Sequence, residues 1–317
     1  MNVLVTGSSG FIGKHLLREL LERGNSVRVL ARPGSKLENT DGVTKVPGRL
    51  EEYDVAAAAK GCSVVYHLAG LTRAPVESEF TLANAVGTHE AARGARTAGA
   101  RFVYVSSQAA AGTGTLEQLR KASDEPKPLS PYGKSKLEGE RLMRKVAGLE
   151  HVIVRPSGVY GPGDKDFLFA FQAAAKGFFP VLGNPARGIT LIHVRDLVDA
   201  IILAGEHAGA NGNTYFAGHP KPTTWAGILE AAGKSVGREP RFVQIPNAVL
   251  WLAANIGELA GIVGRVGLVN RSRALELTAE GWVCDVTPLE ELGWKASVDL
   301  ESGFLETANW YRSQKML

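Results

Sequence analysis

Tyr132 and Lys136, four residues apart, are the residues whose types and spacing most directly suggest chemistry. On a helix, positions i and i+4 share one face, so both side chains can point into one cleft. A phenol near its usual pKa of about 10 is a poor base at neutral pH. A nearby ammonium and a nicotinamide ring favour the phenolate, so we expect Lys136 and such a ring together to lower the pKa of Tyr132 towards the working range. The same spacing occurs by chance on ordinary amphipathic helices. Whether the pair is catalytic must therefore be judged from its position in the fold.

Two serines, Ser106 and Ser107, stand where this pair would need a partner. They follow an apolar run that begins at residue 101 and is typical of a buried strand, and the Tyr–Lys pair comes after it in the chain. Open α/β folds bind their ligands at the carboxyl edge of such strands. There, Ser107 could hydrogen-bond a substrate oxygen and stabilise developing charge. We therefore interpret Ser107, Tyr132 and Lys136 as one catalytic group.

A glycine-rich segment, TGSSGFIG at residues 6–13, follows the first predicted strand and opens the first predicted helix. Gly7 allows the tight turn, Gly10 lets the backbone approach a pyrophosphate, and Gly13 allows the helix to pack closely on the strand. The helix N-terminus attracts the anion. The spacing differs from G-x-G-x-x-G, but its place between strand and helix predicts a dinucleotide site. The alternative is a glycine-rich turn that serves the fold alone.

The end of the second strand distinguishes NAD from NADP. An acid there binds the ribose 2′-hydroxyl, whereas an arginine accommodates a 2′-phosphate. Here the strand 26–31 ends in Ala31, Arg32 follows, and Ser35 and Lys36 come close behind. These residues favour NADP over NAD. The alternative is that Arg32 is a solvated loop charge and that specificity is relaxed.

The elements that must position these groups alternate between short apolar strands and helices. The predicted strands are residues 2–6, 26–31, 43–47, 63–68, 101–106, 151–155 and 213–218. The predicted helices are residues 12–23, 51–60, 78–98, 132–147 and 195–207. Such alternation predicts an α/β fold of the Rossmann type, a doubly wound parallel sheet with helices on both faces.

The regular alternation lapses beyond Pro156 and returns near residue 191. We therefore assign residues 1–156 to a dinucleotide-binding domain, to which the chain returns at about 191–218. Residues 157–190, rich in glycine and proline, and residues 219–317 are expected to form a smaller substrate-binding lobe.

The composition narrows the class of protein. Of 317 residues, 44% are hydrophobic and 21% are charged, as in a globular protein with a large core. The net charge of +4 is spread without a basic block, so we expect no nucleic-acid partner. The N-terminus runs straight into the first predicted strand and the glycine loop, so we expect no signal peptide. Cys62 and Cys284 have no paired spacing, and the seven histidines are isolated. We expect buried thiols, no metal site and a cytoplasmic location.

One largely apolar segment, residues 245–264, has the length of a membrane span. Pro246 and several polar residues interrupt it, and its three glycines would weaken a helix standing alone. We interpret it as a buried helix or a lid over an apolar site, with Trp251 as part of the roof. The alternatives are a plain core role and, against our expectation, a superficial membrane contact.

Taken together, the motifs resemble the extended short-chain dehydrogenase/reductase superfamily, the group of NAD-dependent epimerases and dehydratases. The resemblance runs by motif from residue 1 to about 218, and more loosely to the C-terminus. The matching motifs are TGSSGFIG (6–13), HLAG (67–70), NAVGT (84–88), YVSS (104–107), YGKSK (132–136), RPSGVYGPGD (155–164) and IHVRDLVDA (192–200). The pattern is most similar to the dihydroflavonol-reductase-like and 3β-hydroxysteroid-dehydrogenase-like branches.

The resemblance implies roles for single residues. Ser107, Tyr132 and Lys136 would be catalytic, and Asn84 would order the active-site helix and a water. The residues implied at the cofactor are Thr6, Gly7, Gly10, Phe11, Ile12, Gly13, Arg32, Leu68, Ala69, Gly70, Lys136 and Pro156. The residues implied at the substrate are Thr72, Gln108, Tyr160 and Asp164. Members commonly dimerise through the helices that correspond to 78–98 and 132–147, so we expect a homodimer.

Departures from the family bear on the substrate. Dehydratases place an acid pair after the serine strand, where this chain has Gln108 and two alanines. Sugar-nucleotide epimerases have an asparagine before the V-Y-G-P-G motif and an arginine before I-H-V. This chain has Ser157-Gly158 and Ile189-Thr190 at those places, with Arg187 only nearby. The departures argue against 4,6-dehydration and weaken the nucleotide-sugar hypothesis without excluding it.

Three functions follow from this pattern. The leading hypothesis is an NAD(P)-dependent reductase or dehydrogenase that transfers hydride between nicotinamide and a carbonyl or secondary alcohol of a small, fairly apolar molecule, with Tyr132 as acid/base. The alternative is a nucleoside-diphosphate-sugar epimerase with tightly bound NAD. A third is a non-catalytic NADPH-binding protein on the same scaffold, against which the retained Tyr–Lys pair argues.

Four further polar residues are interpreted as structural. His67 ends a buried strand, and we expect it to pack beside the cofactor rather than act as a base. His193 and Asp196 precede or open a helix, where Asp196 could accept free helix amides. Arg155 is expected to anchor the end of its strand.

Overall fold

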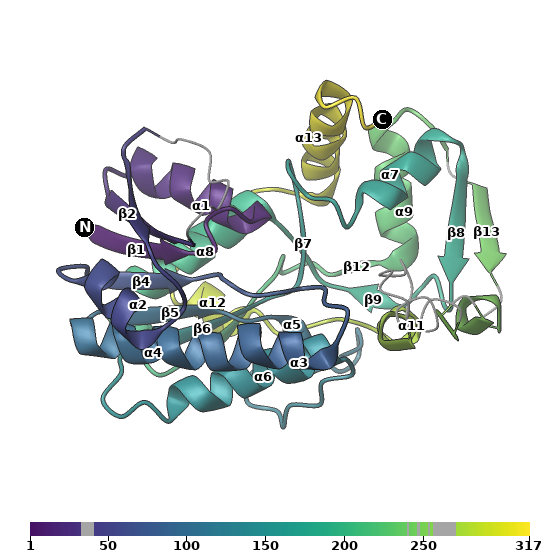
Figure 1. Cartoon of the computed structure of the whole chain (residues 1–317). Coiled ribbons are helices and arrows are strands. Elements are labelled where there is room, and N and C mark those ends of the chain that lie inside the picture. Colours follow the sequence, from purple (N-terminus) through teal and green to yellow (C-terminus); the bar gives the residue numbers. More distant parts are fainter. Residues whose placement is uncertain (33–40, 240, 246–247, 253, 256–270) are drawn as a thin grey trace.

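A seven-stranded parallel sheet lies at the centre of the molecule, with strand order β11-β6-β5-β4-β1-β2-β3. The computed structural model describes residues 1–32, 41–239, 241–245, 248–252, 254–255 and 271–317. The strands of this sheet are β1 (Asn2–Thr6), β2 (Ser26–Ala31), β3 (Val43–Pro47), β4 (Val64–His67), β5 (Arg101–Val105), β6 (His151–Pro156) and β11 (Thr214–Ala217). The strand order reverses between β1 and β4, the place where open α/β folds bind their ligands. The predicted Rossmann-type fold is thereby confirmed (Figure 1).

Both faces of the sheet are apolar. The strands are nearly continuous apolar runs, and successive side chains along a strand point to opposite faces. In β1, Val3 and Val5 join one core and Leu4 joins the other. The first core is covered by α1 (Phe11–Glu22) and α8 (Val194–Glu206) (Figure 1). The second is covered by α2 (Glu52–Ala59), α4 (Gly87–Ala98) and α6 (Pro131–Arg144). The sheet is therefore buried on both sides, as its continuous apolar strands predict.

The predicted helix 78–98 is divided into three parts. They are α3 (Glu77–Phe80), a π-helical turn (Thr81–Val86) and α4. The wider turn places Asn84 in the interior, where its side chain bonds neighbouring segments, and such turns often mark functional sites. The remaining predicted elements of the sheet domain are present, with their ends shifted by a few residues.

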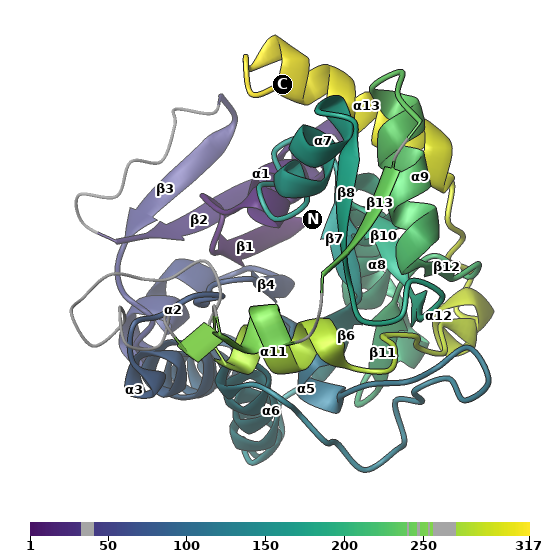
Figure 2. The same cartoon turned by 90° about the vertical axis from the view of Figure 1, so that its right-hand side faces the viewer.

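The second lobe has its own core and three small strand pairs. The pairs are β7 (Gly158–Tyr160) with β10 (Leu191–His193), β8 (Phe178–Leu182) with β13 (Arg241–Ile245), and β9 (Gly188–Ile189) with β12 (Thr223–Thr224). Its helices include α7 (Leu168–Ala175), α9 (Trp225–Ser235), α11 (Arg271–Thr278) and α13 (Leu300–Ser313). Phe171, Phe179 and Phe304 are completely buried between them. Figure 2 shows α9 and α13 side by side, and Arg312 donates to the Ser235 carbonyl at 2.8 Å.

From the sequence we expected residues 219–317 to lie in the second lobe. Part of this segment packs on the sheet domain instead. After α11 it forms α12 (Thr287–Glu291), and Leu289 and Trp294 pack into the first core of the sheet domain. The Trp294 indole donates to the carbonyl of Asp196 at 3.0 Å. This return is decided by contacts across about a hundred residues, which local periodicity does not reveal.

Asp196 also differs from its expected role. Its carboxylate accepts from the backbone amides of Ser297 at 3.0 Å and Val298 at 3.1 Å, so it holds the returning segment. The N-cap of α8 is instead His193, whose ring accepts from the Arg195 amide at 3.3 Å. The correction is that the imidazole caps the helix and the carboxylate joins two distant segments.

The apolar stretch 245–264 falls largely outside the described residues. Within the described part, Leu250 and Ala254 are buried against Ala274 of α11, and Trp251 packs on the same cluster. Val249 and Leu252 are exposed. None of the helices in the described part of the chain has the length and apolar character that crossing a bilayer requires.

Candidate active site

Ser107 and Tyr132 meet at the carboxyl edge of the sheet, as predicted. Ser107 lies two residues beyond the end of β5 and is the N-cap of the short helix α5 (Gln108–Ala111), where its hydroxyl accepts from the Ala109 amide at 3.1 Å. Tyr132 lies in the first turn of α6, which begins at Ser130 because that hydroxyl accepts from the Gly133 amide at 3.1 Å. The Ser107 hydroxyl and the Tyr132 phenol are hydrogen-bonded.

The predicted lowering of the Tyr132 pKa is wrong for this structure. Burial raises the pKa of Tyr132 to about 12, and the hydrogen bond from Ser107 opposes that rise only in part. The Lys136 ammonium donates to the Val105 carbonyl at 2.8 Å and lies 4.5 Å from the centre of the Tyr104 ring. The phenol is therefore protonated at neutral pH, a state suited to donating a proton.

Lys136 is a buried cation, with 4% of its surface exposed. Burial lowers the pKa of Lys136 to about 7, and the Glu140 carboxylate opposes that shift. Its ammonium lies close to Gly70, since a methyl group on Gly70 would be 3.8 Å from it. The lysine thus sits between the catalytic helix and the end of β4, where the predicted HLAG motif begins.

Asn84 ties three segments together. Its amide donates to the Leu71 carbonyl at 2.8 Å and to the Ser135 hydroxyl at 2.9 Å. Its carbonyl accepts from the Leu71 amide at 2.7 Å. These bonds hold the π-helical turn, the segment after β4 and α6 in one arrangement. Gly70 is required beside it, because a methyl group there would lie 2.6 Å from the Asn84 carbonyl oxygen.

The glycine loop forms a cradle that side chains would fill. Gly7 has a φ of 75°, and a methyl group there would lie 2.6 Å from the Leu68 carbonyl carbon. A methyl group on Gly13 would lie 2.8 Å from the Ser8 Cα, so the helix packs directly on the loop. The N-cap of α1, Gly10, leaves the first helical amides of Phe11 and Ile12 without a side-chain cap. The residues present therefore fit a dinucleotide pyrophosphate.

His67 connects this cradle to Asn84. Its Nδ1 lies 2.8 Å from the Thr6 hydroxyl and its Nε2 lies 3.1 Å from the Thr88 hydroxyl. The Thr88 hydroxyl in turn donates to the backbone carbonyl of Asn84 at 2.7 Å. Burial lowers the pKa of His67 to about 3, so the ring is neutral. It is completely buried and has the packing role that the sequence suggested.

Exposed positive charge lies just beyond the carboxyl ends of β2 and β3. Arg32 is exposed directly after β2, and Ser35 and Lys36 lie outside the described residues. Arg49 is also exposed, and its amide donates to the Asp54 carboxylate at 2.7 Å. Ala69 lies beside Gly7, and Pro156 is buried at the end of β6 opposite Ala217.

The residues expected at the substrate divide into two groups. Thr72 is exposed near the Asn84 turn, and Gln108 is buried beside Ser107 with its amide nitrogen unpartnered among the described residues. Tyr160 and Asp164 are both buried in the second lobe. Tyr160 packs 4.8 Å from the Phe304 ring.

Asp164 is used within its own loop. Its carboxylate accepts from the Asp166 amide at 2.8 Å and the Phe167 amide at 2.9 Å, and from the Tyr311 hydroxyl at 3.3 Å. These contacts differ from the substrate contact that we expected. The reason is that the loop 161–167 folds back onto α13, which the motif itself does not show.

A buried ion pair beneath the site was missed at the level of sequence. Arg155 of β6 donates to both oxygens of Glu140 of α6, at 3.0 and 2.6 Å, and the Ser106 hydroxyl donates to Glu140 at 2.5 Å. Arg155 was expected only to anchor its strand. The available signal was the spacing of Tyr132, Lys136 and Glu140, which places all three on one face of the helix.

Two charged groups of the second lobe lie near the catalytic phenol. The carboxylates of Glu276 on α11 and of Asp166 each contribute to the raised pKa of Tyr132. Asp166 forms an exposed ion pair with Arg73, which follows β4, so this pair joins the two lobes. The site is therefore bounded on one side by the sheet edge and on the other by the loop before α7 and by α11.

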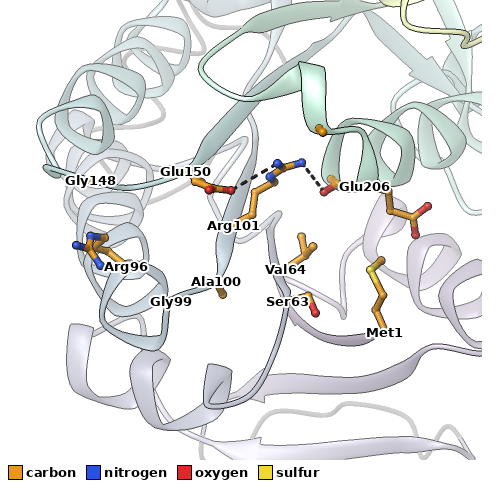
Figure 3. A pocket seen from close by; sticks show the side chains of 12 residues that line it. Met1, Ser63, Val64, Arg96, Gly99, Ala100, Arg101, Gly148, Glu150 and Glu206 are labelled. Carbon is orange, nitrogen blue, oxygen red and sulfur yellow. Dashed lines mark hydrogen bonds and ion pairs between the residues drawn. The ribbon is translucent and has the colours of Figure 1, made fainter.

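A hollow of about 480 Å³ lies at the opposite, amino-terminal edge of the sheet (Figure 3). Its lining includes Met1, Ser63 and Arg101, from the beginnings of three strands. The Arg101 guanidinium already donates to the carbonyls of Gly205 at 3.1 Å and His207 at 2.9 Å. This hollow is remote from the catalytic group, and its arginine serves to hold the end of α8.

Comparisons with known proteins agree with this geometry. Residues 3–218 match the model of the NAD dependent epimerase/dehydratase family. The chain is 33% identical to a ceramide reductase of Caulobacter vibrioides, over 98% of this chain and 94% of that protein. It is 27% identical to a UDP-glucose 4-epimerase of Vibrio cholerae, over 97% and 94%. Its fold is similar to that of MoeE5 in complex with UDP-glucuronic acid and NAD, with a TM-score of 0.75, 25% identity and coverage of 99% and 100%.

Proposed function

The chain belongs to the NAD-dependent epimerase/dehydratase family, and we propose that it is a reductase or dehydrogenase of a small, fairly apolar carbonyl compound or secondary alcohol. The observation that carries this proposal is the meeting of Ser107, the N-cap of α5, and the Tyr132 phenol, in the first turn of α6, at the carboxyl edge of the sheet. A protonated phenol at the sheet edge suits proton donation to a carbonyl oxygen. The similarity to a ceramide reductase, whose named substrate is a lipid, supports an apolar substrate.

The roles of the residues follow from their contacts. A bound nicotinamide cofactor supplies or accepts the hydride. Tyr132 donates its proton to the substrate oxygen during reduction and accepts it back during oxidation. Ser107, already hydrogen-bonded to the phenol, positions that oxygen and stabilises charge that develops on it. Lys136 stabilises the phenolate that the proton transfer leaves, and Asn84 keeps α6 in place through Ser135.

We propose NADP as the preferred cofactor. The support is that Ala31 and exposed Arg32 end β2, where NAD-specific sites carry an acid. Dissociation constants for NADPH and NADH test this directly. We expect NADPH to bind at least about tenfold more tightly, and Arg32→Ala to remove most of that preference. Equal affinities in the unaltered protein would contradict the proposal.

Turnover with purified protein tests the proposed reaction. NADPH or NADH is mixed separately with long-chain aliphatic ketones, a steroid ketone and a water-soluble short ketone, and loss of the reduced nicotinamide is followed. We expect turnover with at least one apolar ketone and little with the short one, because burial of an apolar substrate supplies binding energy. The proposal fails if no ketone oxidises the cofactor and no matching alcohol reduces NAD(P).

A sugar-nucleotide epimerase is the second candidate, favoured by the similarity to the UDP-glucose 4-epimerase and to MoeE5. It would use Tyr132 for a transient oxidation and retain NAD throughout. Incubation with UDP-glucose and analysis of the sugar products separates the two candidates. Formation of UDP-galactose without net change of the cofactor would favour the epimerase over the reductase.

A further inference from the structure

Three charged side chains are buried together beneath the catalytic phenol. Lys136 and Glu140 lie one helical turn apart on α6, and Arg155 approaches from β6. Their exposed fractions are 4%, 2% and 3%. Buried charges are costly unless they are paired, so each must be explained by its neighbours. The cluster holds two cations and one anion.

Glu140 is fixed by three hydrogen bonds. Both of its oxygens accept from Arg155, at 3.0 and 2.6 Å, and one also accepts from Ser106 at 2.5 Å. The Arg155 guanidinium lies 5.7 Å from the centre of the Phe216 ring, and its Nη1 has no hydrogen-bond partner among the described residues. The carboxylate therefore has little freedom to move away from Lys136, which is four residues earlier on the same helix.

Lys136 has no carboxylate in hydrogen-bond contact within the described part of the chain. Its ammonium donates to the neutral Val105 carbonyl at 2.8 Å, and its cation–π contact is with Tyr104 of β5. Burial holds the pKa of Tyr104 well above its usual value and lowers the pKa of His67, on β4, to about 3. Tyr132, on its own helix, is also protonated at neutral pH. Among these groups that face Lys136, Glu140 supplies the negative charge.

We propose that Glu140 is the counter-ion that keeps Lys136 protonated, and that Arg155 and Ser106 position Glu140 for this task. Glu140 is thus a positioning residue that acts on the reaction through Lys136. The inference deepens the proposed function, since it rests on Lys136 acting as the charged partner of Tyr132.

Burial and the Glu140 carboxylate act in opposite directions on the pKa of Lys136, so the charge of the lysine is sensitive to changes around it. Burial lowers the pKa of Lys136 to about 7, while Glu140 raises it. A group near half protonation at neutral pH changes its charged fraction most for a given change in its surroundings. A change of one pKa unit alters the proton affinity tenfold.

The test is a pH titration of the lysine itself in protein that carries ¹³C at the lysine ε-carbons. The Lys136 signal is identified by its loss in Lys136→Met. We expect Glu140→Gln to reduce the proton affinity of Lys136 by about tenfold, seen as a titration midpoint about one pH unit lower. Glu138→Gln is the matched control, because Glu138 lies on the same helix, is partly exposed and pairs with Arg141 at 3.6 Å.

A second variant guards against loss of folding. Glu140→Gln leaves Arg155 buried and unpaired, whereas Glu140→Gln with Arg155→Met removes both charges. We expect the midpoint of the double variant to lie below that of the unaltered protein but to fall less than in Glu140→Gln, because a neighbouring cation is lost as well. A midpoint in the double variant that matches the unaltered protein overturns the proposal, whatever happens to the melting temperature. The titration needs no substrate. If all ketones fail while the midpoint shifts, the reductase assignment is lost and the role of Glu140 in holding the Lys136 charge stands.

Discussion

At the scale of single residues, the proposed catalytic role depends on the protonation states of Tyr132 and Lys136. The Tyr132 phenol is protonated because burial outweighs its hydrogen bond with Ser107. The Lys136 ammonium is near its titration midpoint because burial is offset by Glu140. The expectation that the lysine would lower the pKa of the phenol considered only their spacing. Desolvation raises the pKa of Tyr132 and lowers the pKa of Lys136, and its extent is set by the surrounding structure.

Replacing the phenol tests the proton donor. We expect Tyr132→Phe to reduce kcat by about 10²- to 10⁴-fold, because general acid catalysis is lost while the ring still fills its place. Cofactor affinity should change little. The matched control is Tyr53→Phe, since Tyr53 is 83% exposed on α2, and its kcat should equal that of the unaltered protein. Steady-state kinetics with the best ketone makes the measurement, and an unaffected kcat in Tyr132→Phe would exclude the phenol as donor.

Burial of Lys136 should also appear in stability. Its folded pKa of about 7 is below its ordinary value of 10.5, so between these pH values the unfolded chain binds more protons than the folded one. The free energy of unfolding therefore gains about 1.4 kcal/mol per pH unit from this group as pH rises through that window. Urea unfolding of the unaltered protein and of Lys136→Met at pH 7, 8 and 9 isolates the contribution. We expect the stability of the unaltered protein relative to Lys136→Met to rise with pH, and a constant difference would refute it.

At the scale of elements, two local devices bring the cofactor site and the catalytic helix together. The turn after β1 approaches the segment after β4 so closely that only glycine fits at Gly7. The π-helical turn then turns Asn84 inwards, onto Leu71 and Ser135. Both features depend on backbone geometry. A side chain at Gly7 would push the two segments apart, and the inward position of Asn84 depends on the wider π-helical turn.

The glycine cradle can be tested with one methyl group. Gly13→Ala places a Cβ 2.8 Å from the Ser8 Cα, so α1 must move away from the loop. We expect the dissociation constant of the reduced cofactor to rise by at least about tenfold. Gly209→Ala is the control, because Gly209 is exposed beyond α8 and has only a histidine side chain nearby. Calorimetric titration with NADPH makes the comparison, and equal affinities would show that the loop does not hold the pyrophosphate.

At the scale of the whole molecule, two lobes enclose the catalytic edge of the sheet. The Arg73–Asp166 pair joins them at the surface, and Trp294 joins the C-terminal segment to α8. The face of α4 and α6 away from the sheet stays open, and we propose that it forms the interface of a homodimer. In its support, the π-helical turn that leads into α4 carries two exposed apolar side chains, Leu82 at 66% and Val86 at 42%.

A charge placed on that face should prevent association. We expect Leu82→Glu to shift the protein from dimer to monomer, because an ionised side chain resists burial in an apolar interface. Leu305→Glu is the control, since Leu305 is 49% exposed on α13, away from this face. Light scattering after size-exclusion chromatography gives the molar mass. A monomeric unaltered protein, or a dimer in Leu82→Glu, would contradict the proposed interface.

The sequence by itself determined the succession of strands and helices along the chain and the place of the glycine loop, and it is the source of the proposed group of Ser107, Tyr132 and Lys136. These features depend on short spacings, such as one helical turn or the end of one strand, which the chain carries wherever it folds. Only the tertiary structure decided that Asp164 serves its own loop and that Trp294 returns to the sheet. It also decided the Glu140–Arg155 pair and the direction of the Tyr132 pKa shift. Burial and long-range contacts arise from packing between segments far apart in the chain, and local patterns do not contain them.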